Sequence, residues 1–204
     1  MDSTLINIEC IDEIADFAGV KPHVAAITER AMRGEIVFEE ALQARVRLLK
    51  DLPVAVLTKV YEERLRPNPG AEIMLAALRA AGIKIALVSG GFTFFTQRLQ
   101  ADLALDFARA NTLEVQEGRL TGRVLGGIVG AQAKREFLLE LCTQLRIPPT
   151  ETVAMGDGAN DLAMMQVAGY SIAYHAKPRV QTQAQAVIEY CGLEAVAGLI
   201  EPIR

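Results

Sequence analysis

The chain has 204 residues, which is enough for one globular domain that carries an insert. Apolar residues make up 51% and charged residues 23%, a composition that excludes disordered and collagen-like chains. The formal net charge is −4, so no overall basic field exists that would attract nucleic acid or an anionic membrane. No apolar run approaches the roughly 20 residues that cross a bilayer, and the first residues are acidic. We therefore expect a cytoplasmic protein without nucleic-acid or membrane partners.

The first part of the chain, from residue 11 to about residue 59, has helical periodicity and is rich in Ala, Glu, Arg and Leu. It predicts several short helices and no strand. The turn cluster RPNPG at 66–70 ends this part of the chain.

From residue 71 onward, helical and short apolar segments alternate. Helices are predicted at 71–81, 92–103 and 133–146, and a further helix follows the run 156–161 and ends at residue 167. Strands are predicted at 83–88, 152–155, 171–174 and 186–188, and a β-hairpin at 113–124. This alternation indicates an α/β fold with a parallel sheet, and such sheets bind ligands at the carboxyl ends of their strands. The helical segment 11–65 is interpreted as an insert over that edge.

Two predicted strands end in polar, glycine-rich loops. Ser89-Gly90-Gly91 stands between a strand and a helix, where backbone N–H groups, a hydroxyl and the helix dipole favour an anion such as phosphate. The run 156–161 (GDGAND) offers carboxylate and amide oxygens, which are the ligands that Mg²⁺ prefers. A plain strand–helix turn and an Asp N-cap remain alternative readings of these two loops.

The other candidate residues carry no signal by themselves. Asp2-Ser3-Thr4 reads alone as a fraying end or an N-cap, and Lys134 as a solvated lysine that opens a helix. Glu9 and Arg45 read as surface charges. The three cysteines are too scattered for a disulfide framework or a zinc site.

In combination and in this order, the motifs are far more specific. The chain resembles the haloacid dehalogenase-like phosphatases in four motifs that occur in the same order. These are Asp-x-Thr near the start, Ser-Gly after a strand, a Lys before an amphipathic helix, and Gly-Asp-Gly-x-Asn-Asp after another strand. The longer strings 1–6 (MDSTLI), 29–34 (ERAMRG), 89–93 (SGGFT) and 156–162 (GDGANDL) resemble bacterial phosphoserine phosphatases. The resemblance covers essentially the whole chain.

The resemblance implies a Rossmann-like core formed by residues 1–10 and 66–204, a helical cap insert at 11–65 and a β-hairpin flap at 111–127. It implies Mg²⁺-dependent hydrolysis of O-phosphoserine to serine and phosphate through an aspartyl-phosphate, the last step of serine biosynthesis. The partner is then a small-molecule substrate, and a homodimer is left open.

The resemblance also implies residue roles at the phosphate end of the substrate. Asp2 corresponds to the acid/base aspartate, which protonates the leaving serine oxygen and then deprotonates water, and its carbonyl touches Mg²⁺. Ser89 and the amide of Gly90 bind the phosphoryl oxygens, and Lys134 neutralises their charge.

The remaining roles concern the metal and the amino-acid end. Asp157 ligates Mg²⁺, and Asn160 lies near the substrate. Asp161 contacts either a metal-bound water or the residues that ligate the metal. Glu9 binds the substrate's ammonium group, and Arg45 binds its carboxylate, for which a guanidinium is well shaped.

One position departs from the family pattern, which is Asp-x-Asp-x-Thr. The first Asp, which is the nucleophile and a metal ligand, has no counterpart, because Met1 occupies the x position. The apolar strand that leads into the motif is missing too, and the resemblance places that strand in the middle of the sheet. We expect the 204 residues to lack activity and to fold poorly. Two alternatives stay open: another phosphatase or phosphotransferase of the same superfamily, and a non-catalytic protein that binds phosphate or phosphoserine.

Overall fold

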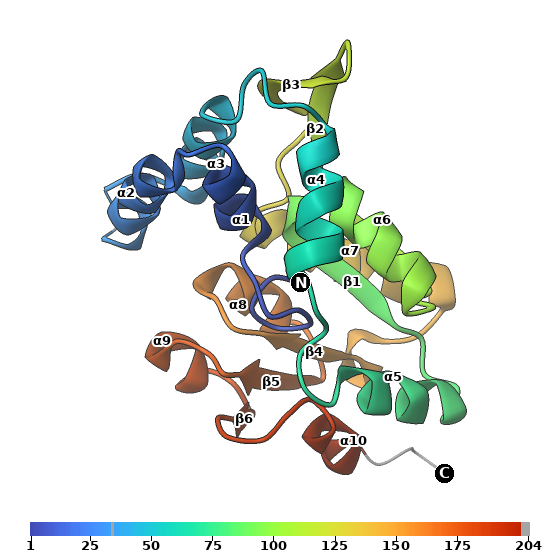
Figure 1. Ribbon diagram of the computed structural model, residues 1–204. Coiled ribbons are helices and arrows are strands. Elements are labelled where there is room, and N and C mark those ends of the chain that lie inside the picture. The colour runs from blue at the N-terminus through green and yellow to red at the C-terminus, as the bar shows by residue number, and fades with distance from the viewer. Residues whose placement is uncertain (34, 201–204) are drawn as a thin grey trace.

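The computed structural model describes residues 1–33 and 35–200, and it has the predicted α/β fold (Figure 1). Gly34, at the end of the string 29–34, and residues 201–204 lie outside the described residues. Within the described ranges, no helix is both long and apolar enough to cross a membrane.

Residues 11–65, which we call the cap segment, are mostly helical in their described part, as the periodicity predicted. Its helices are α1 (Cys10–Phe17), α2 (Lys21–Met32), α3 (Phe38–Arg47), α4 (Ala55–Lys59) and a π-helical turn (Val60–Arg64). Pro22 stands in the first turn of α2, where its missing N–H leaves no helical hydrogen bond unmade.

Strands and helices alternate through the rest of the chain. The strands are β1 (Ala86–Phe92), β2 (Phe107–Gln116), β3 (Arg119–Leu125), β4 (Val153–Gly156), β5 (Tyr170–Tyr174) and β6 (Ala186–Ile188). The helices are α5 (Ala71–Ala80), α6 (Thr93–Asp102), α7 (Ala131–Leu145), α8 (Leu162–Met165), α9 (Pro178–Gln181) and α10 (Ala195–Leu199), with 3-10 turns at Pro149–Glu151 and Ala159–Asp161.

The strands form two separate three-stranded sheets, in the orders β1-β2-β3 and β4-β5-β6. The β1–β2 pair and both pairs of the second sheet are parallel, and β2–β3 is antiparallel. The central strand β5 is buried along most of its length, as expected for a parallel strand that is covered on both faces.

The predicted bounds of the first strand are wrong at both ends. The strand predicted at 83–88 begins at Ala86 and continues to Phe92, through the residues predicted as a loop. The ladder with β2 is interrupted between Val88 and Phe92 and resumes where Phe92 lies opposite Asn111. Ser89-Gly90-Gly91 is therefore an irregularity inside a strand, which keeps its backbone groups out of regular pairing.

The predicted hairpin is confirmed. Glu117 and Gly118 form its turn with φ of 52° and 73°, the positive values that a tight hairpin turn requires. Its first strand is longer than predicted, because β2 also pairs with β1 over Phe107–Asn111.

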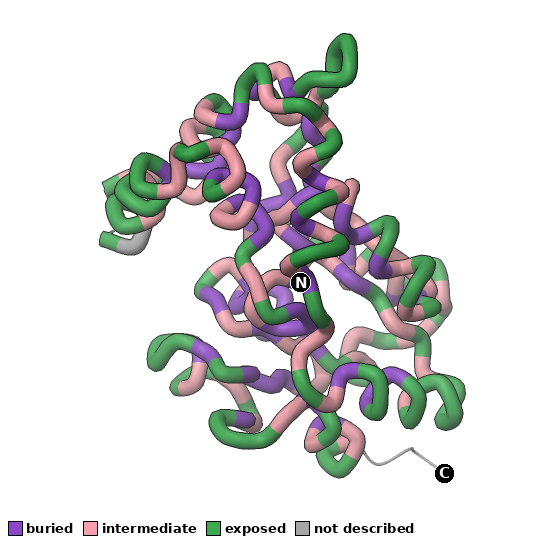
Figure 2. The backbone as a smooth tube through the Cα atoms, in the orientation of Figure 1, coloured by how far each residue is buried: buried purple, intermediate pink, exposed green. Residues whose placement is uncertain are grey.

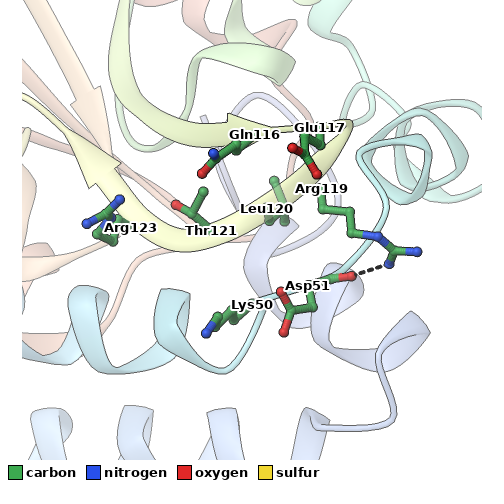
Figure 3. Close-up of a pocket in the computed structure, with 8 residues that line it drawn as sticks. All are labelled: Lys50, Asp51, Gln116, Glu117, Arg119, Leu120, Thr121 and Arg123. Atoms are coloured by element: carbon green, nitrogen blue, oxygen red, sulfur yellow. Dashed lines mark hydrogen bonds between the residues drawn. The ribbon is translucent and has the colours of Figure 1, made fainter.

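The hairpin is joined to the cap segment by backbone hydrogen bonds. The N–H of Asp51 donates to the carbonyl of Leu120 at 2.8 Å, and the N–H of Val54 donates to that of Gly118 at 2.9 Å. Figure 3 shows this junction, where the Arg119 guanidinium donates to the carbonyl of Asp51 at 2.6 Å. Residues 51–54 thus pair with the hairpin, with one β-bridge between Pro53 and Arg119.

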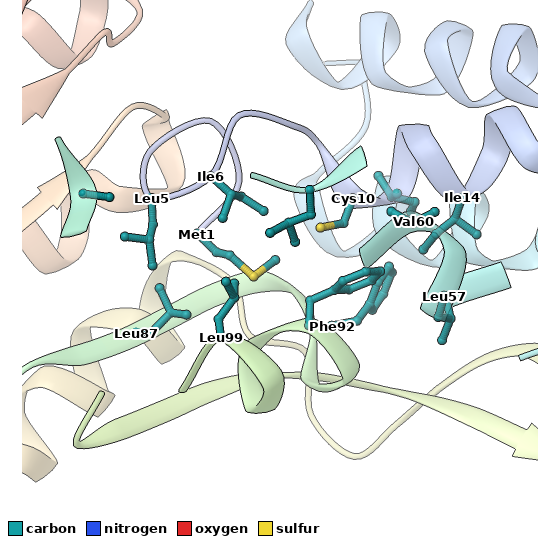
Figure 4. Close-up of a cluster of buried hydrophobic side chains, with 14 of the residues drawn as sticks. Met1, Leu5, Ile6, Cys10, Ile14, Leu57, Val60, Leu87, Phe92 and Leu99 are labelled. Atoms are coloured by element: carbon teal, nitrogen blue, oxygen red, sulfur yellow. The ribbon is translucent and has the colours of Figure 1, made fainter. Parts of the chain in front are cut away.

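One hydrophobic cluster extends across the cap segment and the core (Figure 4). The buried side chains of Met1, Leu5 and Ile6 lie over Leu87 of β1 and Leu99 of α6. Figure 2 shows that buried residues concentrate where the elements meet, whereas the outer helices and the hairpin tip are exposed.

Candidate active site

A cavity of about 1030 Å³ lies between the cap segment, the N-terminal segment and the glycine-rich loops of the core. Every residue to which the resemblance gave a role lines this cavity: Asp2, Glu9, Arg45, Ser89, Gly90, Lys134, Asp157, Asn160 and Asp161. They come together because the irregular end of β1 and the loop that follows β4 meet at one edge, and the cap helices cover that edge.

A second cavity, of about 550 Å³, lies at the junction of the hairpin and the cap segment (Figure 3). Its lining includes Lys50, Asp51 and Arg123 but none of the predicted site residues. The candidate chemistry therefore belongs to the larger cavity.

The irregular segment Ser89-Gly90-Gly91 of β1, which we call the Ser89 loop, is held by a buried asparagine. Ser89 is 2% exposed, and its Oγ accepts the N–H of Gly91 at 2.9 Å. The Asn111 amide donates to the carbonyl of Gly90 at 2.7 Å and accepts the N–H of Val129 at 2.8 Å. Asn111 fixes the orientation of the loop that carries the phosphate-binding candidates.

The cap segment reaches the same loop through an aromatic side chain. A Cβ atom at Gly90 would lie 2.7 Å from the Phe38 ring, so only glycine permits this approach. Phe38 of α3 therefore packs closely against Gly90 of the Ser89 loop.

Lys134 and Asp161 form a buried ion pair, with Nζ 2.7 Å from Oδ1. Lys134 is 4% and Asp161 is 6% exposed. The other oxygen of Asp161 accepts the N–H of Gly158 at 3.1 Å. Because both oxygens accept hydrogen bonds, Asp161 holds Lys134 and the glycine-rich loop in place.

Asp157 is tied to the N-terminal segment. The Thr4 hydroxyl donates to Oδ1 of Asp157 at 2.8 Å, which joins two segments 153 residues apart in sequence. This bond leaves the second carboxylate oxygen of Asp157 available for a ligand.

Asp2 lies beneath the start of α1, where its carboxylate accepts the N–H of Cys10 at 3.4 Å. Burial raises the pKa of the Asp2 carboxyl, while this hydrogen bond and the charge of Lys134 act in the opposite direction. A carboxyl group with a raised pKa is suited to hold a proton and donate it.

Glu9 faces the cavity and accepts the Ser3 hydroxyl at 2.6 Å. Burial together with the nearby negative charges of Asp2 and Asp157 raises the pKa of Glu9 to about 7. A cationic ligand would remove this repulsion between carboxylates, so the position favours a cation.

Arg45 lies on α3, and its side-chain hydrogen bonds to the described residues go to uncharged groups. Its Nε donates to the carbonyl of Ala41 at 3.3 Å, and its Nη1 donates to the Thr28 hydroxyl at 3.4 Å. Burial lowers the pKa of Arg45, while the charges of Asp12 and Glu9 act in the opposite direction.

The donor set fits Mg²⁺ better than a metal that requires a full protein cage. No group of three or more His, Cys, Asp or Glu side chains in the described part of the chain is arranged to hold a metal ion. Mg²⁺ commonly keeps several waters and binds through one or two carboxylates. The carboxylate of Asp157 and the backbone carbonyl of Asp2 supply oxygen donors for such an ion, and both residues line the cavity.

Several residues of the site escaped the sequence analysis. Asn111 acts through the hydrogen bonds described above, and Asp12, Thr28, Lys177 and Arg179 also line the cavity. Thr4 belonged to the Asp-x-Thr motif, but its bond to Asp157 was not predicted. Asn111 had a detectable signal, because asparagine is disfavoured within strands. The others had none, since threonines and charged residues are common on helices and loops.

Comparisons with known proteins agree with this geometry. A sequence profile of the haloacid dehalogenase-like hydrolases matches residues 1–169. A phosphoserine phosphatase of Polaromonas sp. (strain JS666 / ATCC BAA-500) is 55% identical over 206 residues, which cover 98% of this chain and 87% of that protein.

Two solved structures are similar over nearly the whole chain. A substrate-bound phosphoserine phosphatase complex is 43% identical with a TM-score of 0.93, and the match covers 98% of this chain and 95% of that one. A phospho-aspartyl intermediate analogue of phosphoserine phosphatase is 43% identical with a TM-score of 0.92, over 98% of this chain and 96% of its own. The chain therefore belongs to the phosphoserine phosphatases of the haloacid dehalogenase-like hydrolase family.

Proposed function

We propose that the cavity is built to bind O-phosphoserine and to hydrolyse it to serine and phosphate with Mg²⁺. One observation carries the proposal: groups suited to a phosphate and groups suited to an amino acid's ammonium and carboxylate line the same cavity. The relatives named above, which are phosphoserine phosphatases, support the same substrate.

At the phosphate end, Ser89, the N–H of Gly90 and Lys134 bind the phosphoryl oxygens. Lys134 is buried and fixed by Asp161, so its charge is in place before the reaction begins. Phosphoryl transfer depends mainly on such positioning and on neutralisation of the oxygens.

At the other end, Glu9 binds the ammonium group and Arg45 binds the carboxylate. Arg45 lines the cavity from the cap segment, Glu9 from the N-terminal segment and Asn160 from the loop that follows β4. A phosphomonoester without these two groups leaves Glu9 and Arg45 unpaired, which gives the site its preference for an amino acid.

Asp2 serves as acid and then as base. As the phosphorus–oxygen bond to serine breaks and a bond to an aspartate oxygen forms, Asp2 donates its proton to the serine oxygen. Water then attacks phosphorus, the bond to the aspartate breaks, and Asp2 takes up the proton of the water.

The Asp157 carboxylate and the Asp2 backbone carbonyl would hold Mg²⁺, and Asp161 would support the loop that carries Asp157. When bound, the ion supplies positive charge that offsets the charge of the phosphoryl oxygens. The hydrogen bond from Thr4 to Asp157 holds the N-terminal segment against the loop 157–161.

The nucleophile's role is assigned to none of the 204 residues, because Asp2 has the acid/base role. Because the described residues form the cavity without the strand that the family pattern adds, we expect the 204-residue chain to bind phosphoserine without releasing phosphate. Hydrolysis should require a nucleophilic aspartate, which the family pattern Asp-x-Asp-x-Thr places at the end of an apolar strand, two residues before the acid/base aspartate.

The test compares two proteins by calorimetric titration and by phosphate release with Mg²⁺: residues 1–204, and the same chain extended by such a strand. Only the extended chain should release phosphate, and it should prefer phosphoserine to glycerol phosphate. Phosphate release by residues 1–204 would identify another carboxylate as the nucleophile.

The unassigned nucleophile also favours a second function, in which the chain binds phosphoserine without catalysis. Tight binding by both proteins, with no phosphate release from either, would support this second function. Equal activity of the extended chain on phosphoserine and glycerol phosphate would indicate a broader phosphatase.

A further inference from the structure

The Arg45 side chain is held on the cap segment by hydrogen bonds from two helices. The carbonyl of Ala41 belongs to α3, the same helix as Arg45, and accepts from Nε at 3.3 Å. The hydroxyl of Thr28 belongs to α2 and accepts from Nη1 at 3.4 Å. Thr28 is thus the contact that fixes the far end of the side chain relative to a second helix.

The Thr28 hydroxyl has a defined orientation. Its own hydrogen is donated to the carbonyl of Val24 at 3.1 Å, one turn earlier in α2. A hydroxyl has one hydrogen and two lone pairs, so only its acceptor side remains for Arg45. Thr28 also lines the main cavity, which places this contact beside the ligand.

Carboxylates in the cavity compete for the guanidinium. Asp12, Glu9 and Asp2 all attract its charge, and Asp12 lines the same cavity. Even so, no carboxylate of the described residues lies within 4 Å of the Arg45 nitrogens in an ion pair. A guanidinium that turned to Asp12 would have part of its charge and donors occupied before a ligand arrived.

We infer that Thr28 is a positioning residue for substrate recognition: its hydroxyl holds the Arg45 guanidinium free of the cavity's own carboxylates and available to the carboxylate of the ligand. This inference rests on the proposed function, because it takes the ligand of Arg45 to be the carboxylate of phosphoserine. Thr28 itself touches no reacting atom in this arrangement.

The experiment measures dissociation constants of the 204-residue chain for phosphoserine and for phosphoethanolamine, with and without Mg²⁺. Phosphoethanolamine keeps the phosphate and the ammonium group but lacks the carboxylate. Thr28→Val preserves the shape of the side chain and removes the hydroxyl. It should weaken phosphoserine binding about three- to tenfold, the effect of one modest hydrogen bond, and leave phosphoethanolamine binding unchanged.

Three further variants separate positioning from a general structural effect. Thr28→Ser should restore phosphoserine binding, because it returns the hydroxyl. Thr28→Val should have no effect in an Arg45→Ala background, because the group that it positions is absent. Thr143→Val is the matched control, since Thr143 makes the same bond to a carbonyl one turn earlier, at 3.0 Å, on the exposed side of α7.

The outcomes are distinct. Equal weakening for both ligands, or an undiminished effect in the Arg45→Ala background, would overturn the positioning role. Unchanged phosphoserine binding by Thr28→Val would overturn it as well. A parent chain that binds phosphoserine under neither condition would overturn the proposed function and this inference with it.

Discussion

Arg45 and Glu9 are separate probes of substrate recognition at the scale of single residues. Both line the cavity, but they carry opposite charges, so each reports on a different group of the ligand. Neither had a sequence signal apart from the resemblance.

Arg45→Ala should weaken phosphoserine binding by about 10- to 150-fold, because a lost charge-assisted hydrogen bond is worth roughly 1.5–3 kcal/mol. Phosphoethanolamine binding should change little. Calorimetry measures both constants, and Arg47→Ala is a control on the same helix that does not line the cavity. Equal weakening for the two ligands would show that Arg45 does not bind the carboxylate.

Glu9 makes the free energy of unfolding depend on pH in the metal-free protein. Its pKa is raised from 4.5 to about 7 in the folded state, mainly by burial, so between these values the folded state holds a proton that the unfolded state releases. The stabilising contribution is complete below pH 4.5 and is lost as the pH rises to about 7.

Glu9→Gln cannot ionise and should remove this dependence. In urea unfolding with EDTA, the variant should gain stability relative to the parent as the pH rises from 5 to 8. Glu151→Gln, in an exposed position away from the cavity, serves as the control. A constant difference between Glu9→Gln and the parent across this range would contradict the assignment.

At the scale of elements, the hairpin packs closely against the cap segment and is hydrogen-bonded to it. Gly122 of β3 has a φ of 80°, and a Cβ atom there would lie 3.1 Å from Cβ of Lys50 and 3.3 Å from Cα of Arg47. Gly118, at the hairpin turn, has a similar φ of 73°, but a Cβ atom there would have no neighbour within 4 Å. The two glycines therefore separate backbone strain from packing against α3.

Gly118→Ala should cost about 1–2 kcal/mol of stability, from the left-handed backbone alone. Gly122→Ala should cost about 1–3 kcal/mol more, because its methyl group also overpacks the cap junction. Thermal melting should show a fall of about 2–4 °C for each kcal/mol in a chain of this size. Equal melting temperatures for the two variants would mean that α3 moves aside without cost.

Metal binding should stabilise the whole molecule, because the proposed ligands Asp2 and Asp157 come from distant parts of the chain. At a Mg²⁺ concentration about 100 times the dissociation constant, the gain is about 2.7 kcal/mol, or roughly 5–10 °C in melting temperature. Asp157→Asn should abolish most of the shift. Asp51→Asn, whose side chain lies outside the main cavity, should retain it. A full shift in Asp157→Asn would exclude Asp157 as a ligand.

Local chemistry was sufficient to predict much of the fold. The helix of Ala71–Ala80 ends before Gly82, which has a φ of 72°, as a glycine after a helix predicts. The hairpin turn at Glu117-Gly118 and the short buried strands were equally local signals. The start and end of β1 could not be predicted, because they depend on pairing with β2, which is distant in sequence.

The sequence by itself determined the fold class, the order of the elements and the residue types of the site, since periodicity, turn chemistry and motif spacing are properties of short stretches. Only the tertiary structure decided which of these residues meet. It joined Thr4 to Asp157 across 153 positions and Lys134 to Asp161 in a buried pair. It also brought Thr28 of one helix to Arg45 of another. Such contacts depend on how helices and loops pack around a common cavity, and no short stretch of sequence contains that information.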